Sequence, residues 1–161
     1  TIYEGTTAIQ ANDLVGRKTA RDGGAVARAI AGQIEATEGQ LRARDSAAGR
    51  AVAARLATAR RAFLDAVDFV AGQTQASPNA VFAGSVPYLM LAGTVVAGWQ
   101  MARALMVAED RLAEGTDTAF MQAKIATARF YADHILNKAS GLRDSIVEGA
   151  DSVTAMPLES F

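Results

Sequence analysis

Hydrophobic residues recur every three or four positions along most of the chain, with polar residues between them. This period is that of an amphipathic α-helix, whereas a half-buried strand alternates at every second position. Short clusters of glycine, proline and other turn-forming residues interrupt the pattern. The sequence therefore predicts five helical stretches, over about residues 7–20, 25–41, 46–74, 86–114 and 118–149, the fourth preceded by a short lead-in over residues 79–85.

The third and fifth stretches carry the most regular apolar stripes. In the third, the stripe consists of Val52, Leu56, Ala59, Phe63, Ala66, Val67 and Val70. In the fifth, spacings of four and three alternate without a break through Met121, Ile125, Ala128, Ala132, Ile135, Ala139, Leu142 and Ile146. Such a heptad seam requires a partner helix along its length. We therefore expect one long helix over residues 118–149, with Gly141 as its weakest point.

The segments between the stretches are short and rich in capping and turn residues. Thr6 is a candidate N-cap for the first stretch, and Asp22 is a candidate for the second. A turn at residues 77–79 ends the third stretch, and another at residues 115–117 precedes the fifth. Turns this short join neighbouring helices into antiparallel hairpins. The predicted fold class is therefore all-α, an antiparallel four-helix bundle from about residue 22 onward, preceded by one helix.

The composition supports a helical chain and excludes several other classes. Half of the 161 residues are hydrophobic, but only 6% are aromatic, and alanine fills more than a fifth of all positions. Alanine interspersed with leucine, methionine, arginine and glutamate is typical of helices rather than of β-sandwiches. The chain has no cysteine, which excludes a disulfide-stapled secreted domain. Its hydrophobic fraction is too high for a disordered tail.

The net charge and the N-terminal residues limit which partners and which cellular location we expect. Sixteen basic and seventeen acidic side chains give a net charge of −1, so no basic excess is available for nucleic acid. The N-terminus has neither the pattern of a signal peptide nor an initiator methionine, so we expect the chain to belong to a longer polypeptide. The lack of cysteine fits a reducing compartment, and we expect a cytoplasmic location.

A long uncharged run extends from Phe69 to Ala102. Polar residues interrupt it, and its cleaner part, from Val86 to Trp99, is shorter than the roughly 20 residues that a membrane span requires. We therefore predict no membrane span here, but a central helix that is buried on most sides. Gly93 and Gly98 are expected to let another helix approach closely.

Several polar residues are candidates for chemistry, but simpler interpretations are favoured for them. His134 is the only histidine, and no metal-ligand pattern surrounds it, so a structural or solvent-facing role is expected. Glu109 and Asp110 are adjacent and do not face each other on a helix, so we interpret them as part of a solvated last turn. Two local basic pairs, Arg42 with Arg44 and Arg60 with Arg61, have acidic residues nearby and are expected on a solvated face. Trp99, Met101 and Met106 are expected in the core.

The N-terminal segment contains a more specific arrangement. Glu4 is followed by Gly5, which lets the backbone turn and lets a ligand approach, and then by Thr6 at the start of a helix. The exposed N–H groups of a helix start can hold an anion or a polar ligand edge. A carboxylate beside an apolar pocket has a raised pKa and can serve as a general base. From the residues alone, however, a glutamate near an N-cap is usually only a capping device.

The segment Ile2-Tyr3-Glu4-Gly5-Thr6, continued by Ile9-Gln10, resembles the signature near the C-terminus of flavin-dependent acyl-CoA dehydrogenases. Residues 11–18 resemble the branch with an extra C-terminal helical domain, which includes 3-methylmercaptopropionyl-CoA dehydrogenase-like enzymes. Later segments look like the same extension, notably Pro87-Tyr88-Leu89, Gly93-Thr94, Gly98-Trp99 and residues 149–153. The resemblance thus covers the whole chain and is strongest in the first two dozen residues.

The resemblance implies roles for three residues. Glu4 matches the catalytic base, which removes the α-proton of an acyl-CoA thioester while the β-hydrogen leaves as hydride to the flavin. Gly5 matches a substrate-binding position near the thioester and CoA, and Thr6 matches a cofactor-binding position that contacts the flavin. Ala8 and Ala11 depart from the family, which often has a polar residue and an arginine there.

The resemblance also implies a domain organisation. Residues 1–21 would be the end of the catalytic domain, and residues 22–161 the C-terminal helical bundle extension. The full-length parent would bind FAD, oxidise an acyl-CoA to the trans-2-enoyl-CoA in fatty acid metabolism, pass electrons to an electron-transfer acceptor and form a homo-oligomer. We expect this chain alone to bind no cofactor and to be inactive, with the bundle in a structural role. The alternative is a self-contained helical module for protein–protein interaction without an enzymatic role.

Overall fold

The computed structural model describes residues 6–160, and every regular element within that range is helical. The elements are α1 (Thr6–Asp13), the π-helical segment η1 (Leu14–Ala20), α2 (Ala25–Arg42), α3 (Ala47–Gln73), α4 (Pro78–Ala83), α5 (Ser85–Ala113), α6 (Thr118–His134), the 3₁₀ turn η2 (Leu136–Lys138), α7 (Ala139–Val147), α8 (Ala150–Thr154) and the 3₁₀ turn η3 (Leu158–Ser160). The predicted all-α class is confirmed.

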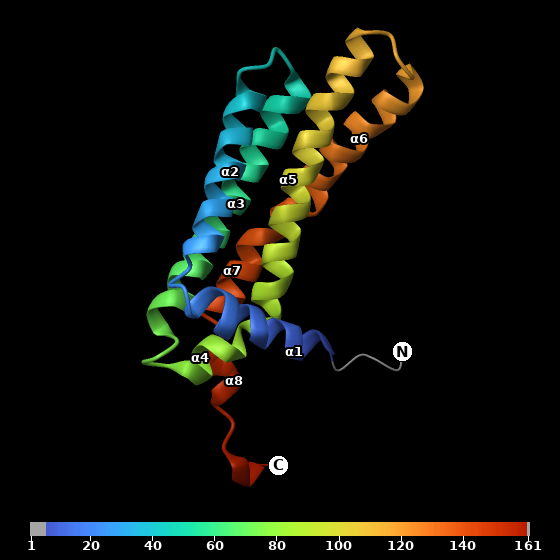
Figure 1. Cartoon of the computed structure of the whole chain (residues 1–161). Helices are drawn as coiled ribbons and strands as arrows, with labels where there is room; N and C mark the ends of the chain where they lie inside the picture. The colour runs from blue at the N-terminus through green and yellow to red at the C-terminus, as the bar shows by residue number, and fades with distance from the viewer. Residues whose placement is uncertain (1–5, 161) are drawn as a thin grey trace.

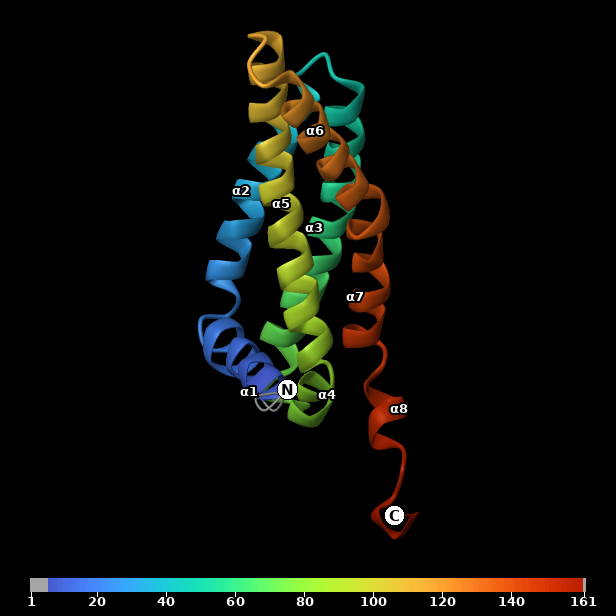
Figure 2. The same cartoon turned by 90° about the vertical axis from the view of Figure 1, so that its right-hand side faces the viewer.

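Four long columns of helix form the bundle. The hairpin α2–α3 lies beside the hairpin made by α5 and the α6–α7 column, and both hairpin turns lie at the same end (Figure 1). We call this the turn end. At the opposite end, α4 connects α3 to α5, and α1 lies across the bundle (Figures 1 and 2). We call this the α1 end. From it, α8 and η3 extend away from the bundle (Figure 2).

The predicted stripe of the third stretch forms the centre of the core. All seven of its members are buried: Val52, Leu56, Ala59, Phe63, Ala66, Val67 and Val70. Helix α3 can be this apolar because it contacts α2, α5, α6 and α7. Burial of one such leucine contributes about 1.5–3 kcal/mol, so this helix supplies a large share of the driving force for folding.

The predicted unbroken helix over residues 118–149 is wrong. Helix α6 ends at His134, and a 3₁₀ turn precedes α7. The side-chain amide of Asn137 donates to the backbone carbonyl of Asp133 at 2.8 Å and so competes for the helical acceptor of its own N–H. The tightened turn buries Leu136 against Gly98, where a Cβ would lie only 2.6 Å from Leu136 Cδ2. The break is therefore at Ile135 and not near Gly141, which lies within α7.

Helix α5 is central but is not buried on most sides. It contacts α1, α2, α3, α6 and α7. Among the described residues, it is the helix whose length and composition would suit a membrane span, yet core helices of water-soluble folds meet the same criterion. Only 28% of its most apolar window is buried, which corresponds to one stripe of the helix. Gly98 allows the close approach expected of it, whereas Gly93 is exposed and has open space beside it.

The first predicted helix is present, but its second half is π-helical. The N-cap residue of α2 is Gly24, and the predicted candidate Asp22 lies two residues before it, where its side chain accepts hydrogen bonds from the start of the helix. Its Oδ1 accepts from the N–H of Gly24 at 2.9 Å, and its Oδ2 accepts from the N–H of Val26 at 3.1 Å. The N–H groups, above all that of Val26, hold the pKa of Asp22 below its usual value. Gly24 adopts a φ of 80°, and a Cβ there would lie 2.6 Å from Val67 Cγ1, so only glycine suits this junction.

Candidate functional site

The structure places one of the three predicted site residues. Glu4 and Gly5 lie outside the described residues. Thr6 is the first residue of α1 and is exposed, as are the next four residues. The predicted catalytic motif therefore leads directly into α1, and its roles remain a prediction.

The segment that follows this motif is anchored in the bundle. Ala11, Val15 and Thr19 recur every four residues and are buried, so one side of α1 and η1 faces the core. The hydroxyls of Thr19 and Tyr88 form a buried hydrogen bond of 3.0 Å, which joins η1 to α5. A π-helical segment is uncommon and often occurs at functional sites. Here it contains Thr19, the partner of Tyr88.

A groove of about 330 Å³ opens beside this hydrogen bond. Its walls come from η1, α2 and α5, with one residue from α3, and most of the surface is apolar. The lining residues are Leu14, Lys18, Thr19, Val26, Ala27, Ile30, Phe63, Tyr88, Ala92, Gly93 and Val96. Two segments that carried the family resemblance, residues 11–18 and 87–94, therefore meet at one place. Periodicity alone did not indicate this site, because it predicts helices and not how they are juxtaposed.

The floor of the groove is polar but contains no charge. Tyr88 is buried, and its ring stacks on Phe63 with a centroid distance of 6.2 Å. Burial raises the pKa of the Tyr88 hydroxyl above its usual value, because the phenolate would be poorly solvated. Tyr88 is therefore a neutral hydrogen-bonding group at physiological pH. Lys18 is the charged side chain that lines the groove.

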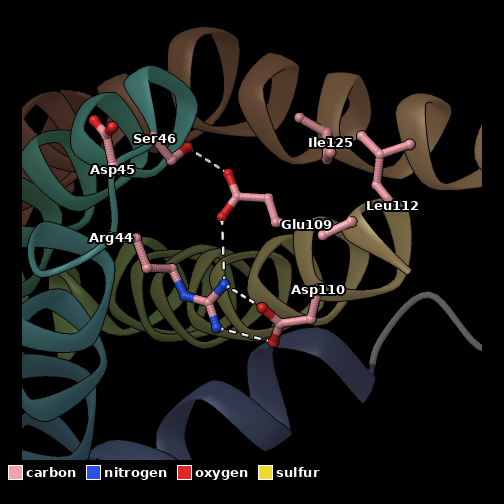
Figure 3. A pocket seen from close by; sticks show the side chains of 8 residues that line it. Arg44, Asp45, Ser46, Glu109, Asp110, Leu112 and Ile125 are labelled. Atoms are coloured by element: carbon pink, nitrogen blue, oxygen red, sulfur yellow. Dashed lines mark hydrogen bonds and ion pairs between the residues drawn. The ribbon is translucent and has the colours of Figure 1, made fainter. Parts of the chain in front are cut away.

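A second, more open pocket of about 550 Å³ lies at the turn end (Figure 3). Arg44, from the α2–α3 turn, binds both carboxylate oxygens of Asp110 at 2.7 and 2.9 Å and lies 3.6 Å from a carboxylate oxygen of Glu109. Ser46 caps α3 by accepting from the N–H of Gly49 and donates to Glu109. The guanidinium of Arg44 holds the pKa of Asp110 below its usual value.

These contacts correct the prediction of a solvated face for Arg44 and Glu109. Both side chains are partly buried and hold the α2–α3 turn against the end of α5. Because the carboxylates already have a cationic or hydroxyl partner, the arrangement is a structural clamp rather than an acid–base pair. We call Arg44, Ser46, Glu109 and Asp110 the Arg44 clamp.

A buried ion pair between α2 and α3 was also missed. Arg60, 12% exposed, binds the fully buried Glu38 through contacts of 2.8 and 3.2 Å and binds Glu35 at 3.0 Å. Arg42 adds a weaker contact to Glu38 at 3.3 Å. Glu38 continues the apolar face of α2 four residues after Ile34, and this position was a signal that the carboxylate is buried. Arg61, by contrast, is exposed as predicted.

The described residues offer no metal site. No group of three or more His, Asp or Glu side chains within residues 6–160 could hold a metal ion. His134 is exposed, as expected, and stacks on Phe130 at 4.6 Å. Residues 6–10 are all exposed, and they line neither the groove nor the pocket at the Arg44 clamp.

Comparison with known proteins gives consistent matches. A family model described as "Acetyl-CoA dehydrogenase C-terminal like" matches residues 27–157. The chain is 48% identical over 157 residues to 3-methylmercaptopropionyl-CoA dehydrogenase of Ruegeria pomeroyi. This match covers 98% of the chain and 26% of that protein. It is 33% identical over 167 residues to a broad-specificity linear acyl-CoA dehydrogenase of Mycobacterium tuberculosis, which covers 94% of this chain and 26% of that protein. The chain thus spans about a quarter of the length of these relatives.

Proposed function

The chain belongs to the C-terminal family of the acyl-CoA dehydrogenases, and from this premise we propose that it completes an FAD-dependent enzyme that oxidises an acyl-CoA thioester to the trans-2-enoyl-CoA. The observation that carries the proposal is the 48% identity to 3-methylmercaptopropionyl-CoA dehydrogenase over 98% of the chain. The match covers nearly the whole chain, so the bundle is aligned together with the segment that precedes it. This favours the enzymatic reading over a self-contained interaction module.

In this proposal, Glu4 is the general base. Its carboxylate would accept the α-proton of the thioester, and FAD, when bound, would supply the acceptor for the hydride from the β-carbon. By the resemblance, Gly5 would be near the thioester and CoA, and Thr6 would supply a polar contact to the flavin. The burial of Ala11, Val15 and Thr19 supports the assignment, because it fixes on the bundle the segment that directly follows the motif.

We assign the bundle a structural role in the same enzyme. The α1 end exposes apolar side chains from three elements: Ile9, Phe82, Val86 and Met90. Contact with the catalytic domain would cover them and would shield the neighbouring active site from water. We retain the division into a catalytic-domain end, residues 1–21, and a bundle extension, residues 22–161. Homo-oligomer formation, electron transfer to an acceptor protein and a cytoplasmic location belong to this proposal.

The test uses the enzyme expressed from its complete reading frame. Glu4→Gln removes the base while preserving size, and we expect kcat to fall about a hundredfold to ten-thousandfold, as for the loss of a general base. Flavin absorbance should not change. Glu159→Gln is the matched control, because it makes the same chemical change at an exposed position outside the motif, and it should leave kcat unchanged. Full turnover in Glu4→Gln would refute the base assignment.

A further inference from the structure

We propose that the groove between η1, α2 and α5 binds a small anionic amphiphile, with an apolar body along α5 and an anionic head at Lys18. The described residues form this groove by themselves, so the inference does not depend on the proposed enzymatic function. Thr6, the described residue of the Glu4 motif, does not line the groove.

The size and walls of the groove fit the apolar part of such a ligand. Its volume of about 330 Å³ lies at the lower end of the range typical of small-molecule sites. It follows α5 from Tyr88 to Val96, which corresponds to about 12 Å of helix at 1.5 Å per residue. This length suits a medium alkyl chain. Leu14, Ile30 and Val96 provide apolar contacts.

Small residues keep the groove open. Ala27 and Ala92 line it from opposite helices, and Gly93 leaves it without a side chain at one position. A Cβ at Gly93 would meet no heavy atom within 4 Å, so the open space there is not filled by the rest of the chain. Glycine within a helix lowers helix stability relative to other residues, so the structure maintains this opening against local propensity.

The polar groups specify the ligand's charge. Thr19 and Tyr88 bond to each other at the floor, so the floor does not require a polar ligand group. No carboxylate lines the groove. Lys18 forms no ion pair within residues 6–160, whereas the neighbouring Arg17 pairs with Asp13 at 2.9 Å. An ammonium group beside an apolar surface complements a carboxylate head and repels a cationic one.

A set of three probes with the same tail tests the charge preference. Decanoate, decanol and decyltrimethylammonium are titrated into the chain below their micelle concentrations, and binding is measured by calorimetry and NMR shifts. Because Lys18 is exposed, we expect decanoate to bind about twofold to fivefold more tightly than decanol, and the cation more weakly than decanol. Lys18→Gln should remove the difference between decanoate and decanol while leaving decanol affinity unchanged. Equal affinities for all three probes in the unmodified chain would overturn the proposal.

A matched pair of glycine variants tests the location. Gly93→Leu fills the groove, whereas Gly39→Leu makes the same change at an exposed position of α2 that does not line it; neither position has a heavy atom within 4 Å of an added Cβ. Both variants should fold, with unchanged or raised melting temperature. We expect at least a tenfold loss of decanoate affinity in Gly93→Leu and none in Gly39→Leu. Unchanged binding in Gly93→Leu, or no binding of any probe to the unmodified chain, would refute the site; the latter would leave the groove as a contact for another protein segment.

Discussion

At the turn end of the bundle, charged side chains of α2, the α2–α3 turn, α3 and α5 are paired with one another, whereas at the α1 end the groove beside Lys18 is open to solvent. Arg44 binds Asp110 and Glu109 at the turn end, and Arg60 binds the buried Glu38 between α2 and α3. At the α1 end, Lys18 has no such partner among residues 6–160. Polar groups that satisfy one another hold a fold together but leave little capacity for a ligand, so function is expected at the α1 end.

The largest effect on stability is expected when one partner of the buried ion pair is removed. Arg60→Ala leaves the carboxylate of Glu38 buried with only the weaker Arg42 contact. We expect the free energy of unfolding to fall by about 3 kcal/mol, because an uncompensated buried charge is costly. Urea denaturation measures the effect. Arg61→Ala is the control on the exposed side of α3 and should change stability by less than about 0.5 kcal/mol. Equal effects of the two variants would contradict a buried role for Arg60.

Gly98 and Gly93 of α5 provide the next test. The side chain of Leu136 occupies the space beside Gly98, whereas the space beside Gly93 is open. In Gly98→Ala, the new Cβ would lie 2.6 Å from Leu136 Cδ2, and we expect a loss of about 1–3 kcal/mol from overpacking. In Gly93→Ala, the added methyl meets no neighbour, and we expect a gain of up to about 1 kcal/mol from helix propensity. Thermal unfolding measures both. The same sign for both changes would show that Leu136 does not constrain α5.

This contrast also shows how far the sequence could predict the molecule. The stripe of α3 was predictable because burial follows local periodicity, and the hydrogen bonding of Asp22 at the start of α2 was predictable because it depends on adjacent residues. The break at Ile135 was not, because it depends on the contact between Leu136 and Gly98 of another helix. Likewise, the family motif predicts a catalytic segment, but it does not predict the groove, whose walls come from four separate elements.

A smaller effect is expected when the Arg44 clamp is opened. Arg44→Ala removes both contacts to Asp110 and leaves the partly buried Glu109 with Ser46 as its polar partner in the clamp. We expect a loss of about 1–2 kcal/mol, as for hydrogen bonds to charged groups. Hydrogen exchange should increase at the α2–α3 turn and at the end of α5, while the α1 end should keep its protection. Increased exchange at η1 as well would show that the two ends are coupled.

The smallest predicted effect concerns two carboxyl groups, one near each end of the bundle, whose pKa values are lowered for different reasons. Asp22 has a lowered pKa mainly because backbone N–H groups donate to it, and Asp110 mainly because Arg44 donates to it and also attracts its charge. Since both folded pKa values lie below the ordinary value of 3.8, each carboxylate stabilises the fold at neutral pH, and this stability is lost as the pH falls through the folded pKa. Asp22→Asn and Asp110→Asn should each make the decline of melting temperature between pH 5 and pH 2 less steep, and an asparagine side chain can still accept from the N–H groups at the start of α2.

High salt should weaken the Asp110 contribution to stability, because charge attraction at a surface is screened, and should leave the Asp22 contribution nearly unchanged. Equal salt sensitivity at both positions would mean that charge attraction stabilises the start of α2 as it does at Asp110. The proposed difference between the two ends would then not extend to these two carboxylates.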